Sequence, residues 1–294
     1  MFTKRIKKTA YRAWHRALFR LQGAEKSTRL PVQTIFVHVP KTAGSSINEY
    51  FSSFVGSRHA ERYVPIDGFK GDAYDAGVSA EGVEAARKGL FVTGHIDWQT
   101  VETIRQPHAF VFTVLRDPAE RLLSFYHYMH HIDENRQPTP GEKERLKKLK
   151  LLTFGEFCTS EDPALLYMTN NFMTRQLAGR LDGTAGTSAP FPDLLGRALQ
   201  NLKTLDYAGF QQTLDADFQA LVKKAGFPPL PLPLENITKK LAAHAGPSYN
   251  PNASKQDILT LAAPRLKWDM AFYQQALELA PEINKRPFRR GYLS

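Results

Sequence analysis

The loop from Pro40 to Ser46 carries the groups that bind a phosphate. It follows an apolar run, Ile35–Val39, that predicts a buried strand, and it leads into a pattern that predicts a helix from Ser45 onward. The N–H groups at a helix N-terminus and the positive end of its dipole favour an anion. Gly44 lets the backbone approach that anion closely, and Lys41 adds a positive charge. The loop therefore predicts a phosphate-type site.

The order of residues in this loop differs from that of triphosphate-binding loops. In G-x-x-x-x-G-K-[ST] the lysine follows the second glycine, whereas Lys41 lies three residues before the only glycine of the loop. A P-loop-like nucleotide-dependent kinase is an alternative interpretation, but no convincing Walker B aspartate follows an apolar strand. We therefore expect an anionic ligand other than a triphosphate, and no metal.

A second candidate anion site follows the apolar run Ala109–Leu115, which predicts the longest strand. Arg116 comes directly after this strand, where open α/β sheets bind ligands. Ser124 lies on the following helix, and its hydroxyl could share an anion with the Arg116 guanidinium. The pattern also fits an Arg116–Asp117 ion pair that ends the strand, with Asp117 or Pro118 starting the helix.

His95 is a candidate general base, because an imidazole titrates near neutral pH. It follows the apolar run Leu90–Thr93, so we expect it on the rim of the same pocket. A structural loop histidine would give the same pattern, and Asp97 or Glu49 is the reserve candidate for the base. His38 lies inside the first predicted strand, which favours a buried, hydrogen-bonded imidazole.

Strands alternate with helices along the chain, and the strands lack polar alternation, as in a parallel sheet covered on both faces. We predict a P-loop-like, doubly wound α/β fold, with a central parallel sheet flanked by helices, in one domain over residues 31–284. The expected helices are Pro118–His131, Pro163–Ala178, Phe191–Leu205, Leu214–Ala225 and Pro264–Leu279. Three connections complete the prediction: an exposed loop with a short helix at Asp133–Lys150, a mobile connection at Gly179–Pro192 and a stiff extended connector at Phe227–Pro233.

The basic charge of the chain lies at its two ends. The net charge is +10 over 294 residues, but residues 1–30 hold nine basic residues against Glu25 alone. Residues 285–294, a basic C-terminal tail, hold four more, which leaves −2 for the body. No apolar run is long enough to span a membrane, and Cys158 is the only cysteine, which favours a reducing cytoplasm.

Apolar residues recur at three- and four-residue steps within residues 1–30, so this segment predicts a basic amphipathic helix. Basic charge opposite a face with Phe2 and Trp14 suits an anionic membrane surface, and we expect a peripheral location at the inner face of the membrane. A solvated basic extension, a helix docked on its own domain or a partner-binding helix fits the same pattern.

Two of these motifs together resemble those of a known enzyme family. Pro40–Ser46 resembles the 5′-phosphosulfate loop of sulfotransferases that use 3′-phosphoadenosine 5′-phosphosulfate (PAPS), and Arg116 with Ser124 resembles their 3′-phosphate motif. The chain is most similar to carbohydrate sulfotransferases of the heparan sulfate 2-O- and uronyl type. Thr174–Leu177 and Leu205–Phe210 are weaker matches. Asn250–Lys255, hereafter the late loop, resembles the loop that closes over the nucleotide.

The resemblance implies sulfuryl transfer from PAPS, as cosubstrate and without a metal, to a hydroxyl of a saccharide by in-line attack. It places the catalytic base on His95, although Thr93 stands where some relatives have a second histidine. Lys41 would stabilise the leaving phosphate. The implied nucleotide-binding residues are Lys41, Thr42, Ala43, Gly44, Ser45, Ser46, Arg116, Ser124, Asn252, Ser254 and Lys255.

Several residues keep two interpretations. Trp98 and Tyr128 are candidates to stack on a sugar ring or to pack in the core, and Arg175 is a candidate to meet an acidic sugar or to brace the pocket. His127, His130 and His131 cluster on one helix but lack a carboxylate or cysteine at a metal-ligand spacing. A non-catalytic, membrane-associated protein with a sulfotransferase fold is a rival interpretation. A nucleic-acid-binding module is another, but no motif that reads RNA or DNA is present.

Overall fold

The computed structural model describes residues 10, 13, 14, 17, 32–55, 63–66, 79–133, 140–179, 181, 190–227, 229–232 and 245–288. The predictions for most of residues 1–30, most of Gly179–Pro192 and the tail beyond residue 288 lie outside these ranges. Within them, no helix is both long and apolar enough to cross a bilayer.

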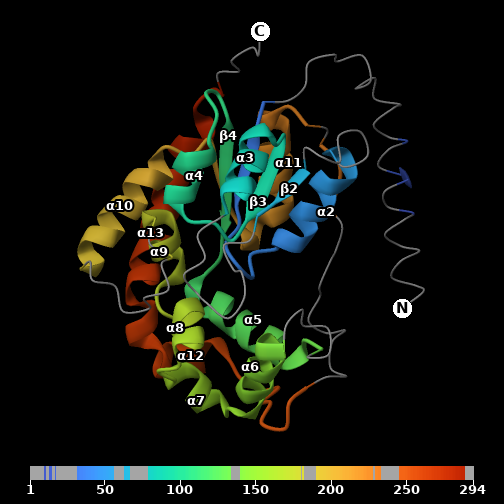
Figure 1. The fold of residues 1–294 in the computed structure, drawn as a ribbon. Helices are drawn as coiled ribbons and strands as arrows, with labels where there is room; N and C mark the ends of the chain where they lie inside the picture. The colour runs from blue at the N-terminus through green and yellow to red at the C-terminus, as the bar shows by residue number, and fades with distance from the viewer. Residues whose placement is uncertain are drawn as a thin grey trace.

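A five-stranded, all-parallel sheet forms the centre of the described part of the chain, in the order β2-β3-β1-β4-β5 (Figure 1). Its strands are β1 (Thr34–Val37), β2 (Tyr63–Pro65), β3 (Phe91–Gly94), β4 (Phe110–Leu115) and β5 (Tyr207–Phe210). The register pairs Val37 with Gly94 on one side of β1 and with Thr113 on the other. The order changes direction at β1, so the loops after β1, β3 and β4 meet at one edge, where doubly wound sheets bind ligands.

Helices cover both faces of the sheet, because consecutive strand residues point to opposite sides. Val111 and Leu115 of β4 join one apolar core, and Phe110, Phe112 and Val114 join the other. The first core contains residues of α4 (Trp98–Ile104), α9 (Phe172–Ala178), α10 (Phe191–Lys203) and α13 (Ala263–Lys285). The second contains residues of α2 (Gly44–Val55) and α11 (Leu214–Ala225). The expected α/β architecture with a parallel sheet is confirmed.

A group of helices lies beyond the carboxyl edge of the strands (Figure 1). It consists of α5 (Pro118–His131), α6 (Pro140–Leu151), α7 (Phe154–Thr159), α8 (Pro163–Thr169) and α12 (Lys255–Leu261). A third apolar cluster, with Tyr126, Phe157 and Leu266 among its buried members, holds the group together. The helix α3 (Ala80–Lys88) and a 3₁₀ turn at Gln211–Thr213 complete the described elements.

The predicted bounds of two helices, Pro118–His131 and Leu214–Ala225, are confirmed. The prediction of an exposed loop with a short helix at Asp133–Lys150 is wrong, since α6 runs for twelve residues and buries Leu146 and Leu149. The basic tail predicted at residues 285–294 begins at the end of α13. Lys285 is the last residue of α13, and the Phe288 ring packs edge-on against Phe110 with centroids 4.9 Å apart.

The predicted helix Pro163–Ala178 is two helices, and Asn171 separates them. Its φ of 48° is left-handed, which stops the helical path. Its backbone N–H donates to the carbonyl oxygen of Arg265 at 2.7 Å, and its Oδ1 accepts from the N–H groups of Trp268 and Asp269. Asn171 therefore replaces part of the hydrogen bonding within α13 and fixes the start of α9 against that helix.

Candidate active site

The Pro40–Ser46 loop has a backbone shaped for an anion. Lys41 and Ala43 have φ angles of 72° and 70°, in the left-handed region that non-glycine residues seldom adopt. Thr42 between them is fully buried, and its hydroxyl donates to the carbonyl oxygen of Val39 at 2.7 Å. An alternation of this kind turns successive N–H groups inward and forms an anion-binding concavity.

Three N–H groups of this loop are candidates to bind a ligand. Among the described residues, those of Thr42, Ala43 and Gly44 have no hydrogen-bond partner within the chain. The first backbone bonds at the start of α2 run from Ser46 and Ile47 to the carbonyl oxygen of Ala43. The loop thus presents donors together with the positive end of the helix dipole.

Gly44 is needed for a reason that differs from the one predicted. A Cβ on Gly44 would lie 1.8 Å from Nε2 of His38, so the close approach is to this imidazole. The structure places His38 one residue after the end of β1, and the prediction that it lies inside the strand is therefore wrong. Burial, the charge of His95 and that of Lys41 lower the pKa of His38 well below its usual value. A neutral imidazole therefore forms one wall of the loop.

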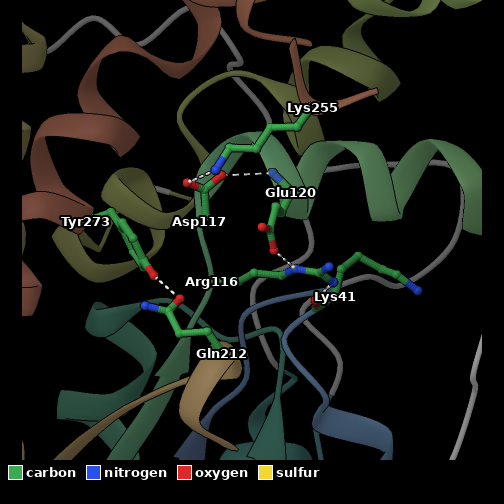
Figure 2. Close-up of polar contacts among 7 residues, drawn as sticks. All are labelled: Lys41, Arg116, Asp117, Glu120, Gln212, Lys255 and Tyr273. Carbon is green, nitrogen blue, oxygen red and sulfur yellow. Dashed lines mark hydrogen bonds and ion pairs between the residues drawn. The ribbon is translucent and has the colours of Figure 1, made fainter. Parts of the chain in front are cut away.

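The Lys41 side chain runs along α5. Its Nζ lies 3.9 Å from the centre of the Tyr128 ring, a cation–π contact, and Figure 2 shows the ammonium pointing away from the Arg116 guanidinium. Burial, and secondarily the charge of Arg116, lower the pKa of Lys41 to about 8. The sequence left two interpretations for Tyr128, stacking on a sugar or packing in the core. The structure adds a third role, because the ring contacts the candidate catalytic lysine.

Arg116 joins the two candidate anion sites. One guanidinium nitrogen, NH1, donates to the carbonyl oxygen of Lys41 at 3.2 Å, and Nε lies 3.5 Å from a carboxylate oxygen of Glu120 (Figure 2). Burial lowers the pKa of Arg116, although Glu120 opposes that shift. Glu120, Ser124 and Tyr128 follow at four-residue steps on α5 and share a face of the helix. The strand end, the loop and this helix face therefore form one site.

Asp117 caps α5 and also holds the late loop. Its carboxylate accepts from the N–H of Glu120 at 3.0 Å and from Nζ of Lys255 at 2.8 Å (Figure 2). The proposed Arg116–Asp117 ion pair is not the one formed, because Arg116 pairs with Glu120 and Asp117 with Lys255. This salt bridge brings the late loop to the same edge of the sheet.

Two other residues of the late loop differ in how available their side chains are. The hydroxyl of Ser254 is engaged in a capping box with Asp257 at the start of α12, while Asn252 is exposed. Tyr249, just before the loop, bonds through its hydroxyl to Nδ1 of His127 at 3.0 Å and to Nε2 of His131 at 3.2 Å. In the described part of the chain, no group of three or more His, Cys, Asp or Glu residues is arranged to hold a metal.

His95 follows β3 and lies beside the wall formed by His38. The two ring centroids are 4.5 Å apart, with the ring planes tilted by 39°. Asp97, a reserve candidate for the base, caps α4 by accepting from the N–H and the hydroxyl of Thr100. Glu49, the other reserve candidate, is 5% exposed on α2. Of the three, His95 combines partial exposure with a place beside the Pro40–Ser46 loop.

The structure assigns two of the ambiguous residues to the core. Trp98 is 4% exposed, and its indole N–H donates to Glu102 at 3.1 Å, so it offers no face to a sugar. Arg175 is fully buried and donates to the carbonyl oxygens of Tyr167 and Asn170, which fits the bracing interpretation.

Gln176 belongs to the motif Thr174–Leu177, and its role could not be predicted from the sequence. Its side chain donates to the carbonyl oxygens of His38 and Ile96. Each of these carbonyls belongs to one of the two chain segments that carry Lys41 and His95. The partners lie 138 and 80 residues away in the sequence, so no local pattern could have shown the contact.

The parallel sheet, the left-handed loop between β1 and α2 and the cations at the carboxyl edge define a P-loop-like α/β protein with a candidate anion site. Residues 1–260 match the model of the sulfotransferase family, and the chain belongs to that family. It is therefore a transferase that moves a sulfuryl group. A comparison with curated proteins finds no match.

Proposed function

We propose that this sulfotransferase moves the sulfuryl group of PAPS to a hydroxyl of a saccharide, with His95 as the base. The observation that carries the proposal is the junction of two cationic sites through the Arg116–Lys41 hydrogen bond. PAPS has two separate anionic ends, whereas a nucleoside triphosphate has one. Two adjacent sites of modest charge suit the first ligand better than the second.

The residues present fit such a ligand. The N–H groups of Thr42 to Gly44, with Ser45 and Ser46 at the start of α2, would hold the phosphosulfate end. Arg116 and Ser124 would hold the 3′-phosphate, and Lys255 would fix the late loop beside it. When bound, PAPS supplies the sulfuryl group and leaves as adenosine 3′,5′-bisphosphate.

The chain's own contribution to the reaction is electrostatic and acid–base. Lys41, drawn from the Tyr128 ring toward the departing 5′-phosphate, would counter the charge that builds there. A ring nitrogen of His95 would take the proton of the acceptor hydroxyl as its oxygen attacks. His38 stays neutral beside it, which avoids a second positive charge next to the base.

A saccharide acceptor fits the resemblance to carbohydrate sulfotransferases, and the described site offers Tyr128 as an aromatic surface beside the Lys41 ammonium. We also propose that the basic segment of residues 1–30 binds anionic lipid at the inner face of the membrane. Cosedimentation with anionic liposomes tests this second point, since a chain that starts at Pro31 should lose the binding.

The test of the function is a transfer assay with radiolabelled PAPS and a panel of poly- and oligosaccharides and glycolipids. We expect label on at least one saccharide, and near-complete loss of that label when His95 is replaced by alanine. Transfer to phenols or amines alone would overturn the saccharide assignment. ATP-dependent labelling that needs Mg²⁺, with no use of PAPS, would favour the kinase alternative.

A further inference from the structure

Gln176 is a buried amide that connects the two loops of the candidate site. Its Nε2 donates to the carbonyl oxygen of Ile96 at 2.9 Å and to that of His38 at 3.1 Å. The residue lies on α9 and is fully buried. Its Oε1 has no hydrogen-bond partner among the described residues, so the two donated bonds orient the amide.

These bonds stand where the pairing of β1 with β3 ends. The last backbone bond between the two segments runs from the N–H of His38 to the carbonyl oxygen of Gly94 at 3.1 Å. Beyond it, one segment turns into the Pro40–Ser46 loop and the other leads through His95. Gln176 therefore links the two segments by hydrogen bonds at the point where the backbone pairing of the sheet ends.

We propose that Gln176 is a positioning residue for sulfuryl transfer, which fixes the distance between the loop that carries Lys41 and the segment that carries His95. The inference rests on the proposed function of those two residues. Ile96 directly follows His95, so a shift of its carbonyl moves the imidazole. A displacement of about 1 Å at a reacting group can reduce the rate by about 100-fold.

The chain contains a matched control at the opposite edge of the sheet. Gln33, just before β1, is 2% exposed, and its Nε2 donates to the carbonyl oxygens of Ala86 and Ile104. It too is a buried glutamine that links two segments through backbone carbonyls. Its partners lie at the ends of α3 and α4 that are remote from the Pro40–Ser46 loop, so its loss should affect stability alone.

The experiment compares Gln176→Met with Gln33→Met in the full chain, since methionine keeps the length of the side chain and removes both donors. We expect both variants to unfold at lower temperature. Only Gln176→Met should lower kcat, by roughly 10- to 100-fold, while its affinity for adenosine 3′,5′-bisphosphate stays within about threefold of the wild type. If Gln176→Met does not fold, Gln176→Asn, which can reach one carbonyl, should show the same pattern at smaller amplitude.

A second measurement does not depend on PAPS chemistry. Histidine-labelled protein gives imidazole NMR signals, and those of His95 and His38 can be assigned with variants of each residue. We expect Gln176→Met, but not Gln33→Met, to shift both signals and the midpoint of the His95 titration. Equal changes in the two variants, or none in Gln176→Met, would overturn the positioning role. If wild-type protein transfers no sulfuryl group, the proposed function fails, and the NMR comparison still decides the role of Gln176.

Discussion

The two edges of the sheet are built from similar parts but carry different chemistry. At the amino edge, the Gln33 amide uses both of its ends, since Nε2 donates to two carbonyls and Oε1 accepts from Gln106. At the carboxyl edge, Gln176 makes the same two donations. Nearby, Lys41 and Ala43 have left-handed backbones, and the N–H groups of residues 42–44 have no partner among the described residues. The polar groups described at the amino edge thus bond to one another, whereas the carboxyl edge keeps donors without a partner among the described residues, as expected of a candidate ligand site.

The largest expected effect separates the proposed base from its neighbour in sequence. His95→Ala should reduce transfer by about 10²- to 10⁴-fold, because proton removal by a positioned base contributes that much. Binding of the bisphosphate should remain. Asp97→Ala should instead cost about 1 kcal/mol of stability, since Asp97 caps α4. The measurements are kcat and thermal unfolding for both variants. A greater loss of kcat in Asp97→Ala than in His95→Ala would indicate that Asp97, and not His95, is the base.

Lys41 provides the next effect. Lys41→Met should lower kcat by about 10²- to 10³-fold, the loss typical when a group that stabilises developing charge is removed. Lys88→Met is the control at the amino edge, where Lys88 pairs with Glu84 on the surface of α3, and its kcat should match the wild type. Steady-state kinetics on both variants tests this difference. Equal losses of kcat in the two variants would show that Lys41 has no special role in transfer.

The pH dependence of stability offers a third contrast. Burial, with the charges of His131, Lys150 and His127, lowers the pKa of His130 from 6.5 to about 4. The unfolded chain therefore binds more protons between these values, and the free energy of unfolding should fall as the pH decreases from about 6.5 toward about 4, by at most roughly 3 kcal/mol from this residue.

Denaturant unfolding across this pH range checks the prediction. His130→Gln should reduce the slope of stability against pH, although His38 and His127, whose pKa values are also lowered, keep part of it. A slope that His130→Gln does not alter would show that His130 is not the responsible group.

The smallest effect concerns Glu120. Its carboxylate lies beside the Arg116 guanidinium and would compete with a phosphate for it. Glu120→Gln should therefore tighten binding of adenosine 3′,5′-bisphosphate by a few-fold, roughly the energy of one partly exposed ion pair. Glu84→Gln serves as the control. If Glu120→Gln binds adenosine 3′,5′-bisphosphate more weakly than the wild type, Glu120 must instead help to bind the nucleotide.

The sequence predicts features that depend on neighbouring residues. The helix Pro118–His131 follows from its aspartate cap, its first-turn proline and its apolar pattern, and all three are present in the structure. The meeting of Arg116 with Lys41 follows from the rule that parallel strands bring their carboxyl ends to one edge. The strands β2 and β5 were not predicted, because Pro65 shortens the apolar run of β2, and Ala208 and Gly209, which have low strand propensity, interrupt that of β5.

The features that escaped prediction are long-range contacts. The break at Asn171 depends on bonds to α13, nearly a hundred residues away in the sequence. The Lys255–Asp117 salt bridge and both bonds of Gln176 also join distant segments. Such contacts leave no local periodicity. The only sequence signal for Gln176 was its place in the motif Thr174–Leu177.

We propose that the carboxyl edge of the sheet holds a two-ended anion. Calorimetry of adenosine 3′,5′-bisphosphate and of AMP, with wild type and Arg116→Ala, tests it most directly. We expect wild type to bind the bisphosphate about 10- to 100-fold more tightly than AMP, as one charge-assisted contact allows, and Arg116→Ala to bind both alike. Equal affinities of wild type for the two nucleotides would contradict the account.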